Sequence, residues 1–289
     1  MDKHSFLIAL GILCLLPVSL FSRSRVVNDT IFSKKLNADR AYSVYLPPSF
    51  GEVQGKKYPV LYLFHGMSQT NQDWVWRGHV QEVADRLIYS QEAREMIIVM
   101  PDAGGDIYKE IWNGFFNMPG WLYEDFFFEE FLPYVENKYP IIGDKENRAV
   151  AGLSMGGGGA TGYGLWHADK FASVYAMSAL MSIPEEGAAR FDNPDSKLAI
   201  LTRTVIERSC IKRVTDADAG TIQALKSVRW FVDCGDDDFL LDRNIEFFQA
   251  MRKAGIPCQF RVRDGGHDWE YWHSALYMCL PFVSETFSK

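Results

Sequence analysis

The stretch that decides the fold reads Ala149-Val150-Ala151-Gly152-Leu153-Ser154-Met155-Gly156-Gly157-Gly158-Gly159. Its first five residues are apolar or small and predict a buried strand, and the small residues after Ser154 predict the start of a helix. A serine flanked by glycines between a strand and a helix fits the Gly-x-Ser-x-Gly turn that presents a nucleophile, because only small residues allow so tight a turn. A glycine-rich turn without function is the alternative. The strand before Ser154 and the helix after it favour a catalytic nucleophile.

The surrounding sequence predicts a mostly parallel sheet. Short, mostly apolar runs predict strands at residues 41–46, 60–64, 96–100, 149–153, 173–177, 228–234 and 258–262. Helical patterns lie between several of them, at residues 79–89, 123–139 and 242–254, and Pro133 is expected to kink or split the second. Strands that alternate with helices indicate an α/β fold with a doubly wound sheet, here of the α/β-hydrolase type. The first run ends at Pro47-Pro48 and predicts an antiparallel edge strand, and the last alternates in polarity as the opposite edge would.

Residues 181–227 do not follow this alternation of strands and helices, because they mix turn residues and helical patches without a clear strand. We interpret them as a short insertion above the sheet that forms a lid or one wall of a site. No other shift in composition divides the 289 residues, so residues 23–289 are expected to form one domain.

A serine hydroxyl needs a base, and the position of each histidine selects one. His267 lies in Asp264-Gly265-Gly266-His267-Asp268-Trp269, directly after the last predicted strand, where an α/β-hydrolase carries its base. His273 is a nearby rival, and a surface histidine without function is the other alternative. The remaining histidines are at positions 4, 65, 79 and 167, in places that do not suit a base. His267 is therefore the predicted general base.

The acid should follow the strand at residues 228–234, where the sequence offers Asp236, Asp237 and Asp238 after Gly235. Composition does not choose among the three, which are also compatible with a solvated acidic turn. The oxyanion hole needs two backbone N–H donors. We expect them from Met155, directly after the nucleophile, and from Met67 in the loop His65-Gly66-Met67 after an earlier strand. His65 is then structural.

The net charge and the N-terminal residues bear on the partners and the location of the protein. A net charge of −7 provides no basic surface for nucleic acid or anionic lipid. Residues 6–21 form an uncharged, mostly apolar run followed by Ser22-Arg23-Ser24-Arg25, which predicts an export signal of about residues 1–22. A membrane anchor is the alternative, because the run is only slightly shorter than a spanning helix. The protein is therefore expected to be secreted or periplasmic, and free of the membrane once the signal is cleaved.

Four cysteines remain after the predicted signal: Cys210, Cys234, Cys258 and Cys279. An even number in an exported chain permits two disulfides, but a domain of this size does not need them, and separate thiols are slightly favoured. The sequence contains no Cys-x-x-Cys pair and no cluster of Cys and His, so no metal is expected. The proposed chemistry also calls for no cofactor.

At this point the motifs resemble a known family. His65-Gly66-Met67, Gly152-Leu153-Ser154-Met155-Gly156-Gly157, Cys234-Gly235-Asp236-Asp237-Asp238-Phe239-Leu240 and Gly266-His267-Asp268-Trp269 are similar to those of the esterase D family. That family includes feruloyl esterases, acetyl xylan esterases, S-formylglutathione hydrolases and mycolyltransferases. The resemblance runs from about residue 40 to the C-terminus and is weakest at residues 181–227. It implies that Asp238, just before the Phe-Leu pair, is the acid, with Asp236 as the fallback.

Within the family the sequence looks most like secreted esterases that cut acyl groups from plant cell-wall polysaccharide. The resemblance therefore implies a feruloyl esterase acting on an acylated polysaccharide or oligosaccharide. An acetyl xylan esterase is the alternative, and a catalytically silent carbohydrate-binding relative is the alternative from another class. Trp269, two residues after the predicted base, and Trp74 and Trp76 are candidates for binding an aromatic acyl group, although tryptophans more often belong to the core.

Overall fold

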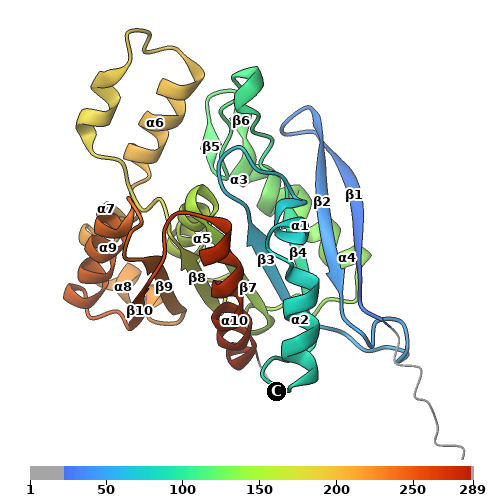
Figure 1. Ribbon diagram of the computed structural model, residues 1–289. Helices are drawn as coiled ribbons and strands as arrows, with labels where there is room; N and C mark the ends of the chain where they lie inside the picture. The colour runs from blue at the N-terminus through green and yellow to red at the C-terminus, as the bar shows by residue number, and fades with distance from the viewer. Residues whose placement is uncertain (1–22, 288–289) are drawn as a thin grey trace, which may run out of the picture.

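The computed structural model describes residues 23–287, which form an eight-stranded sheet flanked by helices on both faces (Figure 1). The sheet order is β1-β2-β4-β3-β7-β8-β9-β10. β1 pairs antiparallel with β2, β2 pairs antiparallel with β4, and the remaining neighbours are parallel. The strands are β1 (Arg25–Ser33), β2 (Ala38–Leu46), β3 (Val60–Phe64), β4 (Ile97–Pro101), β7 (Arg148–Leu153), β8 (Ser173–Met177), β9 (Arg229–Gly235) and β10 (Cys258–Arg263). The predicted α/β-hydrolase fold is confirmed.

The helices and short elements follow the expected alternation. The helices are α1 (Asp73–Trp76), α2 (Val80–Tyr89), α3 (Tyr123–Phe126), α4 (Leu132–Lys138), α5 (Ser154–Trp166), α6 (Lys197–Glu207), α7 (Cys210–Thr215), α8 (Ala219–Leu225), α9 (Leu241–Lys253) and α10 (Trp269–Thr286). Shorter elements are η1 (Ile107–Lys109), the π-helical turn η2 (Phe127–Phe131), η3 (Lys145–Asn147), η4 (Glu185–Arg190) and a hairpin of β5 (Asn117–Met118) and β6 (Trp121–Leu122).

Two apolar layers hold the helices against the sheet, because successive strand residues point to opposite faces. In β3, Tyr62 and Phe64 belong to the layer that also holds residues of α3, η2, α4, α5, α7 and α9, whereas Leu61 and Leu63 belong to the layer with α2 and α10. All five residues of β3 are buried, as are those of β4, β7 and β8. Burial on both faces explains why the sequence shows these strands as continuous apolar runs.

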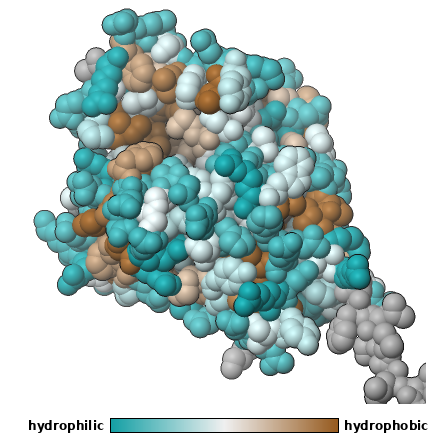
Figure 2. Space-filling model, in the orientation of Figure 1, coloured by the Kyte–Doolittle hydropathy of each residue, from teal (hydrophilic) through white to brown (hydrophobic). Residues whose placement is uncertain are grey.

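The insertion contains η4, α6, α7 and α8 and no strand, as predicted, and α6 stands apart from the sheet in Figure 1. Leu201 and Val205 of α6 form a small apolar cluster with Met118 of β5. Figure 2 shows apolar residues where this part of the molecule meets the body. The insertion is therefore joined to the body through the β5–β6 hairpin and α5.

The structure corrects one expectation and adds two elements that were not predicted. The run ending at Pro47-Pro48 is not an edge strand, because β1, which was not predicted, pairs with the outer side of β2. The helix expected at residues 123–139 is divided into α3, η2 and α4, with Pro133 in the first turn of α4, in agreement with the split expected there. The C-terminal helix α10 was not predicted.

Other expectations concern the cysteines, the membrane and metals. All four cysteines among residues 23–287 are free, which confirms the preference for separate thiols. No helix within that range is long and apolar enough to cross a membrane. The same residues contain no cluster of three or more Cys, His, Asp or Glu side chains suited to a metal. The predicted export signal lies outside the described residues.

Candidate active site

Ser154 lies at the sharp turn between β7 and α5, with a left-handed backbone conformation at φ +52°. Such a conformation is strained for a residue with a side chain and is typical of a nucleophile held on a tight turn. The turn requires glycine on both sides. A Cβ added to Gly152 would lie 2.4 Å from the Gly156 carbonyl oxygen, and one added to Gly156 would lie 2.3 Å from the His65 carbonyl oxygen. The small residues therefore bring α5 against the strands and expose the serine at its N-terminus.

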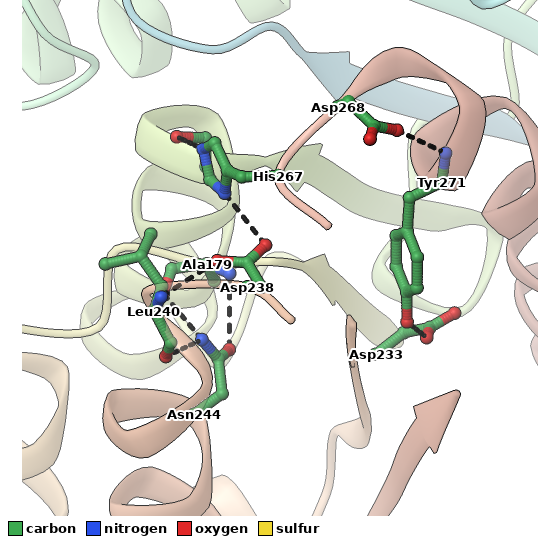
Figure 3. Close-up of polar contacts among 9 residues, drawn as sticks. Ala179, Asp233, Asp238, Leu240, Asn244, His267, Asp268 and Tyr271 are labelled. Carbon is green, nitrogen blue, oxygen red and sulfur yellow. Dashed lines mark hydrogen bonds and ion pairs between the residues drawn. The ribbon is translucent and has the colours of Figure 1, made fainter. Parts of the chain in front are cut away.

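His267 connects Ser154 to Asp238 from the loop between β10 and α10. Figure 3 shows its imidazole directed at the Asp238 carboxylate. Its Nε2 lies 2.9 Å from Ser154 Oγ, and its Nδ1 lies 2.8 Å from Asp238 Oδ2. A carboxylate accepts hydrogen bonds only, so Nδ1–H donates to Asp238 and Nε2 is left to accept from the serine hydroxyl. The three side chains come from three separate loops and form the arrangement that removes a proton from a serine.

The three adjacent aspartates have different environments. Asp236 and Asp237 are exposed, whereas Asp238 is buried. Burial raises the pKa of Asp238, but hydrogen bonds from His267 and from the Leu240 N–H outweigh it and hold that pKa below its ordinary value. Asp236 instead accepts a hydrogen bond from the Gly265 N–H at 3.1 Å and so braces the loop that carries His267. The structure thus brings Asp238 to the imidazole, not Asp236.

The predicted oxyanion donors come from the start of α5 and from the loop after β3. Met155 is the second residue of α5, so its N–H is among those that have no partner within the helix. Met67 lies within a turn that is closed by hydrogen bonds from the Gly66 N–H to Gln69 Oε1 and from the Gln69 N–H to the Gly66 carbonyl. His65 is buried in this turn. Its Nδ1–H donates to the Gly66 carbonyl and its Nε2 accepts from the Ala103 N–H, which agrees with a structural role.

The other described histidines are engaged away from Ser154. His167 contacts Glu124 at 2.7 Å, and His273 donates to the Gly78 carbonyl at 2.8 Å. His79 lies on the surface, 3.9 Å from Glu82. Burial lowers the pKa of His65, which keeps that imidazole neutral. Of the histidines within residues 23–287, His267 is the one that contacts the serine.

The tryptophan expectations need correction. Trp74 is fully buried and donates from Nε1 to the Phe64 carbonyl, so it belongs to the scaffold and is closed to a substrate. Trp269 is 9% exposed and packs edge-on against Trp74 under the Arg77 guanidinium, so it offers a substrate little surface. Trp76 is 70% exposed and stays a prediction.

Asp233 and Asn244 support the site and were not predicted (Figure 3). Asp233 is fully buried and accepts hydrogen bonds from the Tyr175 and Tyr271 hydroxyls, and the Tyr271 ring in turn lies against Gly265 of the histidine loop. Asn244 bonds the backbone of residues 179 and 240, which joins the end of β8 to the loop of Asp238. No local pattern marks either residue.

A small cavity of about 20 Å³ lies between the insertion and α5, beside Met155. Val205 and Cys210 of the insertion line it together with Gly158 of α5 and Phe116. Cys210 is fixed there, because its N–H donates to the Met181 carbonyl. The insertion thus packs along α5 next to the residue that follows the nucleophile, and its role as a lid or wall of the site stays a prediction.

Comparisons with known proteins agree with this geometry. The Esterase family model matches residues 33–283, which include every residue of the site. The chain belongs to the esterase family. The fold, the family and the serine–histidine–aspartate arrangement together make it a carboxylic ester hydrolase.

Three similar proteins have more specific names than the family model. A solved ferulic acid esterase is 67% identical to this esterase, with a TM-score of 0.89, and the match covers 92% of this chain and all of the other. The endo-1,4-beta-xylanase/feruloyl esterase of Xylanibacter ruminicola is 31% identical over 86% of this chain, which spans 30% of that longer protein. The acetyl esterase of Caldicellulosiruptor saccharolyticus is 24% identical over 81% of this chain and 86% of its own length.

Proposed function

We propose that this esterase is an exported feruloyl esterase that releases hydroxycinnamic acids from plant cell-wall polysaccharide. The observation that carries the chemistry is the bridge of His267 between Ser154 and Asp238. The acyl preference is supported by the ferulic acid esterase that is 67% identical across nearly the whole chain. Export is supported by the apolar run at residues 6–21 of the sequence.

In the first step Ser154 Oγ attacks the ester carbonyl while His267 Nε2 takes the hydroxyl proton. Asp238 accepts the Nδ1–H bond and stabilises the imidazolium that forms. The carbonyl oxygen gains negative charge and is held by the N–H groups of Met67 and Met155. The tetrahedral intermediate then collapses, and His267 gives its proton to the departing sugar oxygen, which leaves an acyl group on Ser154.

Water then replaces the sugar in the second step. His267 takes a proton from the water as it attacks the acyl carbonyl, and Ser154 leaves with that proton when the acid departs. Both steps depend on proton transfer between His267 Nε2 and the attacking or departing oxygen. For Ser154 Oγ this distance is 2.9 Å. The sugar oxygen and the water must come within a similar distance of Nε2. The low pKa of Asp238 keeps this carboxylate charged and the imidazole tautomer correct throughout.

The test compares hydrolysis of methyl ferulate and of acetylated xylan by wild-type protein, with Ser154→Ala as the blank. Ferulate release that disappears in the variant supports the proposal, and the variant should lose several orders of magnitude in rate. Acetate release alone would refute the feruloyl assignment and favour an acetyl esterase, a reading supported by the acetyl esterase relative.

A fluorophosphonate probe separates this proposal from a silent carbohydrate-binding relative. The probe reacts with a serine only when a base activates it. We expect labelling of wild-type protein and none of Ser154→Ala. An unlabelled wild-type protein that still binds xylan would refute the enzymatic assignment.

A further inference from the structure

Phe239 presents an aromatic ring to solvent in the middle of the candidate active site. Its neighbours Asp238 and Leu240 are buried, whereas Phe239 is 75% exposed. The loop holds this orientation, because Asp238 accepts from the Leu240 N–H and the Leu240 carbonyl accepts from Asn244 Nδ2. Exposure of a phenyl ring forgoes the free energy that its burial would contribute, so a fixed exposed ring beside reacting groups indicates a contact made by a ligand.

The ring lies directly against the general base. Its centroid is 4.5 Å from that of the His267 imidazole, at an interplanar angle of 50°. Trp272 contacts the same imidazole edge-on at 4.9 Å and is buried. The imidazole is therefore supported by a buried indole and adjoined by a phenyl group that is open to solvent.

The proposed mechanism places the leaving sugar at this point. The departing oxygen must come within hydrogen-bonding distance of His267 Nε2, about 3 Å, to receive its proton. The sugar ring attached to that oxygen then begins beside the imidazole. The Phe239 ring can reach it there, because its centroid is 4.5 Å from that of the imidazole. The acyl group is bonded to the opposite side of the same carbonyl carbon, so it points away from the departing oxygen.

We propose that Phe239 forms the subsite for the sugar that carries the ester, with the C–H face of a furanose or pyranose ring packed on the phenyl group. This inference rests on the proposed function, because it assumes a sugar as the leaving alcohol. Apolar area removed from water drives the contact, and the ring is rigid, so little conformational entropy is lost on binding. Phe239 thereby selects sugar esters over esters of small alcohols.

The test uses two esters with the same acyl group. Methyl ferulate lacks the sugar, and a feruloylated arabino-oligosaccharide carries it. We expect Phe239→Ala to lower the ratio of kcat/KM for the sugar ester to that for methyl ferulate about tenfold, mainly through KM. Phe239→Trp restores an aromatic face and is expected to keep the ratio at the wild-type value or above.

Phe32→Ala is the matched control, because Phe32 is an exposed phenylalanine on β1 and is 58% exposed. It should leave the ratio unchanged. A Phe239→Ala variant that slows both esters equally would overturn the inference, since the ring would then only shield the imidazole. A ratio equal to that of wild type would also overturn it. Wild-type protein inactive on both feruloyl esters would instead refute the proposed function, and this inference with it.

Discussion

The hydroxyl of Tyr271 is expected to stabilise the loop that carries the general base. It donates to Asp233, a fully buried carboxylate that also accepts from the Tyr175 hydroxyl at 2.7 Å and from Arg263 Nε at 3.4 Å. Tyr271→Phe removes one donor and keeps the ring, which packs against Gly265. No cavity forms, so the change isolates the hydrogen bond.

The magnitude follows from the charge and burial of the acceptor. A hydrogen bond to a charged group contributes about 1.5–3 kcal/mol to stability. Two donors remain on Asp233, so the carboxylate is not left unpaired and the larger penalty for an uncompensated buried charge does not apply. We therefore expect the free energy of unfolding to fall by about 2 kcal/mol.

Urea unfolding followed by tryptophan fluorescence measures this change, with the slope m checked for constancy. Tyr89→Phe is the matched control, because it deletes the same hydroxyl from a side chain that is 89% exposed. Its effect should stay within about 0.5 kcal/mol. If Tyr271→Phe were no more destabilising than Tyr89→Phe, the Asp233 network would not stabilise the fold and the reasoning would be wrong.

Four further predictions concern the site and its surroundings. Asp238→Asn should lower kcat about 10⁴-fold on methyl ferulate while fluorescence and circular dichroism stay native, because the imidazole loses its orienting carboxylate; a loss below tenfold would contradict the assignment of the acid. The pKa of Asp238 is lowered in the folded state, so the folded protein binds this proton less readily than the unfolded chain does. The group therefore contributes stability above about pH 4, and this contribution is lost as the pH falls through the folded pKa. The stabilities of wild type and Asp238→Asn in acid unfolding should therefore converge at low pH. Gly156→Ala places a Cβ 2.3 Å from the His65 carbonyl oxygen and should cost about 1–3 kcal/mol in urea unfolding, whereas Gly120→Ala, at a position with open space but φ +79°, tests the backbone penalty alone. Burial raises the pKa of Cys210 to about 12, so its thiol should stay unmodified by Ellman's reagent at pH 8 until denaturant is added; rapid labelling in the native state would show that the insertion opens.

Much of the site could be predicted from the sequence because its signals are local. The turn at Ser154 needs small residues within two positions on either side, so its pattern is written in consecutive residues. The order of the chain places His267 after the last strand, and the parallel strands bring both loops to the same edge of the sheet. The buried strands are equally visible, because burial on both faces requires an apolar residue at nearly every position.

Other features depend on which distant segments pack together. β1 pairs with β2, so the strand that ends before Pro47 lies inside the sheet and not at its edge. The residues of that strand do not indicate that β1 pairs with it. Trp74 and Trp76 are two residues apart, yet one is fully buried and the other is 70% exposed. The first fills the layer between the sheet and α10, and only the packing of that layer decides which ring is inside.

The sequence by itself determined the nucleophile, the general base, the order of the catalytic residues along the chain and the class of reaction. Composition left three aspartates open and the family resemblance implied Asp238, which the structure places against His267. The tertiary structure decided which tryptophan is scaffold, and that Phe239 faces solvent beside the imidazole. The physical reason is that turn geometry and strand burial act on neighbouring residues, whereas the exposure of one side chain among similar neighbours is set by contacts with segments far along the chain.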